Sequence, residues 1–424
     1  MNRPTRVVQF RLSDVLAIFF LAALILPLAS QLTNGLRGTW LVFLLWTPFA
    51  LSETSSSRLS LSLAARKFEA ILLLLFFSLV VVNALLGRGY TGGYHVMVFI
   101  TLAMVWTVEA ITSAQERTAF RNITLGLFML IGLDAMRSLP HLWGNPGYPR
   151  QIMTANVDQI AIQEAAFRGV GNYHLYTANA LALPILVGFA LRFGPARYCL
   201  LPLGAPIAIA ISISTLAGAF GLMVLGLSAS AILYLVITKR SFVGTVALGM
   251  VATAIFVSWL SIAASSEQAN FVLSKIERLF TGVSDAGIVA GDETGRSDLF
   301  LTSWNTFQEN WLFGVGASTG RENPYLYTLV GGHSSFADLL AEYGILGFGL
   351  FALFFGSIVR RVFSGFWKTR SSPSAQACLI SAALYAAYSI VNPIVLSLNV
   401  ISLWFFVVRG YFERYANEPE SGGN

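Results

Sequence analysis

A histidine, an arginine and two acids lie in one stretch of an otherwise apolar chain, where a long polar segment leads into an apolar helix. The stretch runs from 282 to 351 and contains Arg296, His333, Asp338 and Glu342. Imidazole titrates near neutral pH, so His333 could act as a general base that takes a proton from a hydroxyl group. The alternative for His333 is a local hydrogen bond at the surface or at an interface. The stretch therefore predicts chemistry where a polar loop meets an apolar helix.

Arginines of the polar segments could bind a diphosphate group. A guanidinium group matches phosphate oxygens with paired hydrogen bonds and keeps its charge. Arg296 is the first candidate, with Arg278 and Arg168 behind it. Each of them could instead be a solvated loop charge. Two or three arginines around one diphosphate would neutralise a leaving group without a metal ion.

The two acids are four residues apart, so a helix places Asp338 and Glu342 on one face. Acids in the first turns stabilise a helix N-terminus, and that is the simpler interpretation. One acid could instead orient His333 or pair with an arginine. The glycines of LFGVGASTGREN predict close turns, with a phosphate cradle as the alternative. The sequence has no Walker loop or zinc-ligand spacing, so we expect neither a cofactor nor a metal ion.

Composition requires that these residues be carried by a membrane protein. Of 424 residues, 55% are hydrophobic and 11% are charged, and mean hydropathy is +0.68. Soluble proteins average about 25% charged residues. This chain therefore has too few charged residues to form the water-facing surface of a soluble protein of its length. We interpret the net charge of +6 through membrane topology and expect no nucleic-acid partner. Cys199 and Cys378 lie far apart in apolar segments and form no disulfide framework.

The apolar runs predict an all-α, polytopic membrane helix bundle with about twelve transmembrane helices. The first run is interpreted as a retained span rather than a signal peptide. Every expected inner connection contains Lys or Arg, which predicts that both termini lie inside. The expected spans are residues 14–33, 38–52, 68–87, 94–112, 120–137, 175–192, 197–214, 216–237, 242–264, 334–359, 375–395 and 397–412.

Two expected outer loops are long, at residues 138–174 and 265–333, and each contains amphipathic segments of helical period. Such apolar faces must lie on the helix bundle or in the membrane interface. The chain divides into three parts. Residues 1–264 hold the first nine spans, 265–333 form the large outer loop with active-site residues, and 334–424 hold the last three spans and a short cytoplasmic tail.

The segments GRSDLFLTSWNTFQENWLFGVGASTG and GGHSSFADLLAEYGILGFGLF resemble the O-antigen ligase and polysaccharide polymerase superfamily of bacterial envelopes. In that family an arginine precedes a tryptophan-containing helix, a glycine turn follows, and a histidine precedes a helix ending in E-x-G-x-x-G. Asn310-Trp311 stands where the family often has Asn-Pro, and Ser334 where it often has Asn. A looser likeness puts Arg168 in register. The matching residues are Arg296, Trp304, Gly314, Gly316, His333, Glu342, Gly344 and Gly347, and for the looser likeness Arg168, Gly171 and Asn179.

The resemblance implies a glycosyltransferase of bacterial cell-envelope polysaccharide biosynthesis. The donor would be a glycan on undecaprenyl diphosphate at the periplasmic face of the inner membrane. The acceptor would be another glycan or the lipid A core, and neither a nucleotide sugar nor a metal would be needed. His333 would assist the acceptor hydroxyl and Arg296 and Arg168 would hold the diphosphate, whereas Arg278 rests on chemistry and location alone.

The sequence leaves polymerase and ligase both open within that family. The segment HSSFADLLAEYG favours the polymerase, because it looks more like the exopolysaccharide and capsule members. A transporter or flippase for a lipid-linked oligosaccharide is the second class, and it would need broken helices and charges at the membrane midplane. A membrane scaffold is the third, and it would leave the gathering of His333 and the arginines in outer loops unexplained.

Overall fold

A computed structural model describes residues 10–86, 92–115, 117–152, 159–192, 197–214, 216–239, 296–316, 330 and 334–415, and every element in these ranges is a helix. The helices of the amino-terminal half are α1 (Leu12–Ile25), α2 (Pro27–Leu32), α3 (Leu36–Ser52), α4 (Ser56–Ala65), α5 (Lys67–Leu85), α6 (Gly92–Ala114), α7 (Arg117–Gly144), α8 (Tyr148–Gln151) and α9 (Gln159–Phe167). The later helices are α10 (Tyr173–Arg192), α11 (Arg197–Ile213), α12 (Ala217–Tyr234), η2 (Leu235–Lys239), α15 (Arg296–Glu309), α16 (Ser335–Thr369), α17 (Pro373–Val391), α18 (Leu398–Leu403), η3 (Trp404–Arg409) and α19 (Gly410–Tyr415).

Seven of the described helices are long and apolar enough to cross a membrane, and two shorter apolar helices accompany them. The prediction of an all-helical multi-pass membrane protein is therefore confirmed at this level. The count of twelve spans and the placement of both termini inside stay predictions. The expected span at 242–264 lies outside the described residues, as do most residues of the expected loop at 265–333.

Several helix boundaries differ from those expected. The expected span at 14–33 is two helices, because Pro27 lacks a backbone N–H and begins α2 at its first turn. The expected span at 334–359 continues as α16 to Thr369, and the part of α16 after the non-helical Gly344, residues 345–369, extends about 37 Å at about 1.5 Å per residue. That length exceeds a hydrocarbon core of about 30 Å. The exposed helix α4 was not expected.

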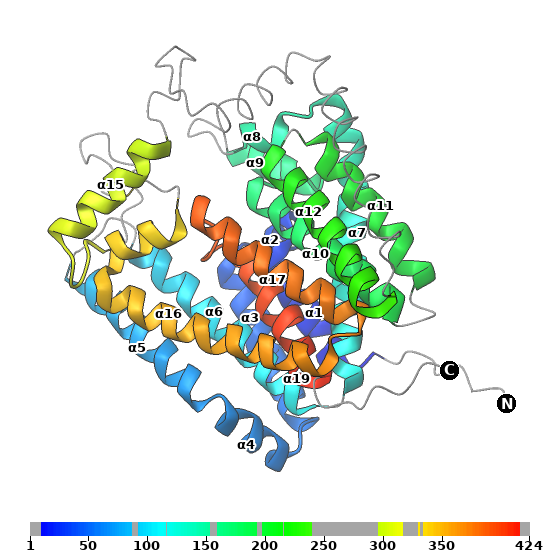
Figure 1. Ribbon diagram of the computed structural model, residues 1–424, viewed down its shortest axis with the longest axis horizontal. Helices are drawn as coiled ribbons and strands as arrows, with labels where there is room; N and C mark the ends of the chain where they lie inside the picture. Colours follow the sequence, from blue (N-terminus) through cyan, green and yellow to red (C-terminus); the bar gives the residue numbers. More distant parts are fainter. Residues whose placement is uncertain are drawn as a thin grey trace.

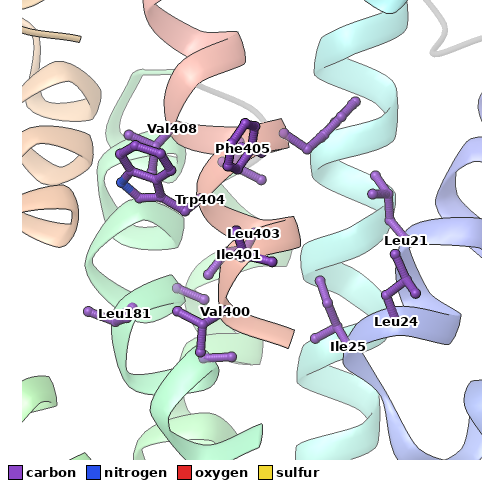
Figure 2. Packing of buried hydrophobic residues seen from close by; sticks show 14 of the residues in the cluster. Leu21, Leu24, Ile25, Leu181, Val400, Ile401, Leu403, Trp404, Phe405 and Val408 are labelled. Carbon is purple, nitrogen blue, oxygen red and sulfur yellow. The ribbon is translucent and has the colours of Figure 1, made fainter. Parts of the chain in front are cut away.

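Among the described residues, the core is one apolar cluster that joins the first and last described helices. Figure 2 shows the helix formed by α18 and η3 lying between α1 on one side and α10 on the other. Trp404 stacks on Phe355 with ring centroids 4.8 Å apart, and Phe405 stacks on Phe354 at 5.6 Å. Segments from opposite ends of the sequence thus build one scaffold.

Buried arginines and glutamates tie four of these helices together at one end of the bundle, which we call the basic end. Arg409 lies 2.6 Å from Glu69, and Arg66 lies 3.2 Å from Glu109, with all four side chains buried. Burial lowers the pKa of Arg66, but Glu109 and the neighbouring glutamates outweigh burial and hold it above its usual value. The members of this network are Arg66, Glu69, Glu109, Arg361, Arg409, Glu413 and Arg414.

The opposite end, which we call the loop end, carries the short helices α8, α9 and α15 and the first turn of α16. In Figure 1 α15 lies toward the upper left and α8 and α9 lie at the top centre, whereas α4 and α19 lie toward the bottom. Asn399 donates a hydrogen bond to the carbonyl of Ile25, and Ser335 donates one to the carbonyl of Asn392. These bonds join the starts and ends of four helices, so the loop end is a structured surface.

Candidate functional site

Helix α16 is broken near its start, and the segment at 311–316 fills the break. Gly344 has non-helical angles of φ 61° and ψ −169° inside α16. The N–H groups of Val315 and Gly316 donate to carbonyls of Ala341 and Glu342, at 3.0 and 2.8 Å. In the other direction, the segment's carbonyls accept from the N–H groups of Ile345 and Leu346, at 2.8 and 3.3 Å. The break therefore leaves these backbone groups satisfied, as an apolar environment requires.

Two glycines make this interlocking possible. Gly314 has φ 70° and Gly344 has φ 61°, which is the left-handed region that favours glycine. A Cβ atom at Gly314 would lie 2.4 Å from the Glu342 carbonyl, and one at Gly344 would lie 2.4 Å from the Leu312 carbonyl. The predicted close turns are confirmed at Gly314 and Gly316, and Gly320 lies outside the described residues.

Asp338 joins α15 to the start of α16. Its carboxylate accepts a hydrogen bond from the Ser303 hydroxyl at 2.7 Å and one from the Ser334 backbone N–H at 3.2 Å. The Ser334 hydroxyl accepts from the N–H of Ala337, which is the bond of an N-cap residue. Asp338 thus performs the helix-end role that was the simpler interpretation, and it also fixes α15 on α16.

Glu342 lies beside a histidine and a tyrosine in a buried contact. His95 Nδ1, at the start of α6, lies 2.6 Å from the Tyr343 hydroxyl and 3.9 Å from Glu342 Oε2. Phe76 and Phe99 pack edge-on against the Tyr343 ring. The aromatic contacts fix the tyrosine, and the tyrosine in turn fixes the imidazole. We call His95, Glu342 and Tyr343 the buried triad.

The structure does not describe two of the four main candidates. His333 and Arg278 lie outside the described residues, and Arg296 is placed only as the first residue of α15. Arg168 is exposed and lies 3.5 Å from Glu164 on the same helical turn. The roles of these four residues stay predictions. Among the candidates, the structure places Asp338 beside Ser303, and it places Glu342 in the buried triad with His95 and Tyr343.

Helix α15 presents its polar face to the protein and its aromatic face to the outside. Ser303 and Thr306 are buried, whereas Phe300 is 46% exposed, Trp304 39% and Trp311 58%. The expected helical segment is confirmed. The sequence predicted that the apolar face of this segment lies either on the helix bundle or in the membrane interface. The described part of the helix bundle does not cover this face. The membrane interface remains the expected one.

A second polar contact holds the loop between α7 and α10. Arg137 donates hydrogen bonds to Asp134 at 3.2 Å and to the carbonyl of Ala166 at 2.9 Å. Gly169 has φ 74° and lies against the Asp134 carbonyl. This contact anchors the segment that carries Arg168, and the sequence did not single it out.

The residues that sequence reasoning missed are His95, Tyr343 and Ser303. His95 is one of the chain's four histidines, and its partner Tyr343 is 248 residues away. The one available signal was a histidine at the start of an apolar run. Within the described residues, no group of three or more His, Cys, Asp or Glu side chains could hold a metal ion.

The chain matches no protein-family model and no curated protein sequence.

Proposed function

We propose that the chain is an integral membrane glycosyltransferase of the O-antigen ligase and polysaccharide polymerase type. It transfers a glycan from undecaprenyl diphosphate to a hydroxyl group of a glycan or lipid A core acceptor, at the periplasmic face of the bacterial inner membrane. The acceptor oxygen bonds to the anomeric carbon, the bond from that carbon to the diphosphate breaks, and undecaprenyl diphosphate leaves. His333 takes the acceptor's proton, and Arg296, Arg278 and Arg168 balance the charge of the leaving group.

The observation that carries this proposal is the interlocking of 311–316 with the break in α16. Gly314, Gly316 and Gly344 all belong to the resemblance, and all three have positive φ. Backbone hydrogen bonds of 2.8 to 3.3 Å join the two segments that carry them. These three glycines therefore belong to one structural unit, in which residues 311–316 lie against the break in α16.

The described polar residues act as positioning residues in this proposal. Asp338 connects α15, which begins at Arg296, with Ser334, which directly follows His333 in the sequence. Within the buried triad, His95 of α6 contacts Glu342 and Tyr343 about one turn further along α16. This arrangement joins α15, which begins with the proposed phosphate ligand, to Ser334 and α16, and a catalytic site requires such rigid support.

A transporter for a lipid-linked oligosaccharide is the second candidate, and the break in α16 favours it. Transporters build substrate sites from discontinuous helices, and Asp338 and Glu342 are buried in the half-helix before the break. Against a transporter, Asp338 is held by hydrogen bonds to Ser303 and Ser334 and so has a structural role. The two candidates differ in whether the glycan is covalently changed.

The test uses the purified chain in proteoliposomes with undecaprenyl-diphosphate-linked glycan extracted from the native strain. The proposal predicts longer carrier-linked glycan or glycan joined to added lipid A core, together with free undecaprenyl diphosphate. Arg296→Gln should abolish product, while Arg37→Gln should not, because Arg37 is an exposed arginine outside the proposed site. Passage of unchanged glycan across the bilayer, with no covalent product, would overturn the proposal in favour of the transporter.

A further inference from the structure

An open groove of about 660 Å³ lies at the basic end, on the opposite end of the bundle from the proposed active site. Its walls come from the start of α5, the second half of α16, and the helix formed by η3 and α19. None of its lining residues belongs to the proposed active site. The groove therefore needs its own explanation, and that explanation is independent of the proposed function.

The wall supplied by α16 changes from apolar to basic along its length. Residues four apart lie on one face of a helix, and Ala352, Gly356, Arg360, Ser364 and Lys368 follow this spacing. A Cβ atom at Gly356 would meet nothing within 4 Å, so the small residues leave an open channel. The channel runs from apolar side chains toward two cationic ones.

The floor of the basic half consists of arginines held by glutamates. Arg361 lies 2.9 Å from Glu69 and 3.0 Å from Glu413, and Arg409 lies 2.6 Å from Glu69. Behind them, Arg66 lies 3.2 Å from Glu109 and 3.4 Å from Glu413, and Arg414 lies 3.8 Å from Glu109. The four arginines of the network thus face three glutamates. Arg360 and Lys368 add two further positive charges at the mouth. Among the described residues, the basic half of the groove thus has more positive side chains than glutamates.

The apolar half has the character of a lipid-facing surface. Phe68 and Leu353 line the groove and are each 56% exposed. Trp367 does not line the groove, but it adjoins Lys368 at the mouth and is 65% exposed. Tryptophan and lysine are both typical of the membrane–water boundary. A ligand that fits this wall has an apolar chain beside Leu353 and an anionic group beside Arg360 and Lys368.

We propose that this groove binds an anionic phospholipid, with the phosphate diester beside Arg360 and Lys368 and an acyl chain along Leu353 and Phe68. Guanidinium and ammonium groups are the usual protein ligands of phosphate, and basic pockets between helices at the cytoplasmic side of a membrane bind anionic headgroups. The bound lipid would balance the positive excess of the buried network and brace α16 against α5 and α19.

The test measures lipid binding by native mass spectrometry of the full chain in detergent. Phosphatidylglycerol and phosphatidylcholine with identical acyl chains are compared. Wild type should bind phosphatidylglycerol more tightly, and the double variant Arg360→Gln/Lys368→Gln should bind it roughly 30-fold more weakly, since two basic groups at a lipid surface are lost. The control is Arg58→Gln/Arg370→Gln, which removes two exposed charges that do not line the groove.

A second variant keeps the charges and fills the channel. Gly356→Leu places a side chain in open space, and it should also weaken binding of phosphatidylglycerol. Glycerol phosphate, which has the headgroup chemistry without acyl chains, should not compete at the same concentration. The proposal is overturned if Arg360→Gln/Lys368→Gln binds phosphatidylglycerol as tightly as wild type does. It is also overturned if the control double variant loses as much affinity as the groove variant, or if glycerol phosphate competes as well as the lipid.

Discussion

His95 and Tyr343 come from helices far apart in the sequence, and their side chains meet 2.6 Å apart inside the protein. The sequence predicted the acids of α16 and their shared face, and it gave the helix-end role of Asp338 as one alternative. It could not predict the buried triad, because a contact between residues 248 positions apart depends on how α6 packs against α16. The same holds for Ser303, whose hydroxyl looks like any other polar group of an amphipathic segment.

Tyr343→Phe tests the buried triad at this scale. Phenylalanine keeps the aromatic packing, but His95 loses its 2.6 Å partner, so the free energy of unfolding should fall by about 1–3 kcal/mol. Denaturant titration in micelles measures this loss. Tyr411→Phe is the control, since Tyr411 accepts a hydrogen bond from Arg192 at the basic end. Both variants should lose stability, but only Tyr343→Phe should lower glycosyl transfer. Equal activities would contradict the positioning role.

At the scale of elements, α16 is one helix by hydropathy and two by backbone geometry. The apolar run after Ser334 predicted a continuous span, and glycines inside apolar helices are common enough that Gly344 gave no decisive signal of a break. The break exists because 311–316 supplies partners for the freed backbone groups. That contact depends on a loop at some distance in the chain, so local pattern could predict close turns at Gly314 and Gly316 but not what they close against.

Gly344→Ala should disrupt the break, whereas Gly349→Ala on the same helix should not. A methyl group at 344 would lie 2.4 Å from the Leu312 carbonyl at a φ of 61°, but one at 349 meets nothing within 4 Å. We expect little folded Gly344→Ala protein in the membrane and near wild-type levels of Gly349→Ala. Fluorescence-detected size-exclusion chromatography of tagged variants measures both. Normal amounts and activity of Gly344→Ala would contradict the interlocking as the organising feature.

At the scale of the whole molecule, hydropathy predicted the class of architecture well because lipid allows few backbone arrangements. Seven described helices have the length and composition of spans. The sequence did not predict the buried network at the basic end. Arg66, Arg361 and Arg409 lie in or near expected inner connections, where basic residues were interpreted as charges that set topology. They are instead partly or fully buried against Glu69, Glu109 and Glu413. The basic residues at this end therefore also hold the helices together through ion pairs.

Site-directed labelling tests the predicted orientation. Two variants each carry one added cysteine. Ser57→Cys places it in the exposed helix α4, and Glu309→Cys places it at the exposed end of α15. In intact cells with a permeabilised outer membrane, a membrane-impermeant maleimide should label Glu309→Cys. It should reach Ser57→Cys only after the inner membrane is opened. Wild type gives the background from the native cysteines. The reverse pattern would place the loop end in the cytoplasm and exclude a periplasmic active site.

The most direct measurement is the glycan profile of the native strain carrying His333→Ala, beside wild type and a deletion. Immunoblotting confirms equal membrane levels, and His141→Ala provides the matched histidine control. The account predicts that His333→Ala matches the deletion. Single repeat units without long chains would identify a polymerase, and long chains that stay on the carrier would identify a ligase. A normal glycan profile from His333→Ala at normal protein levels would contradict the catalytic assignment.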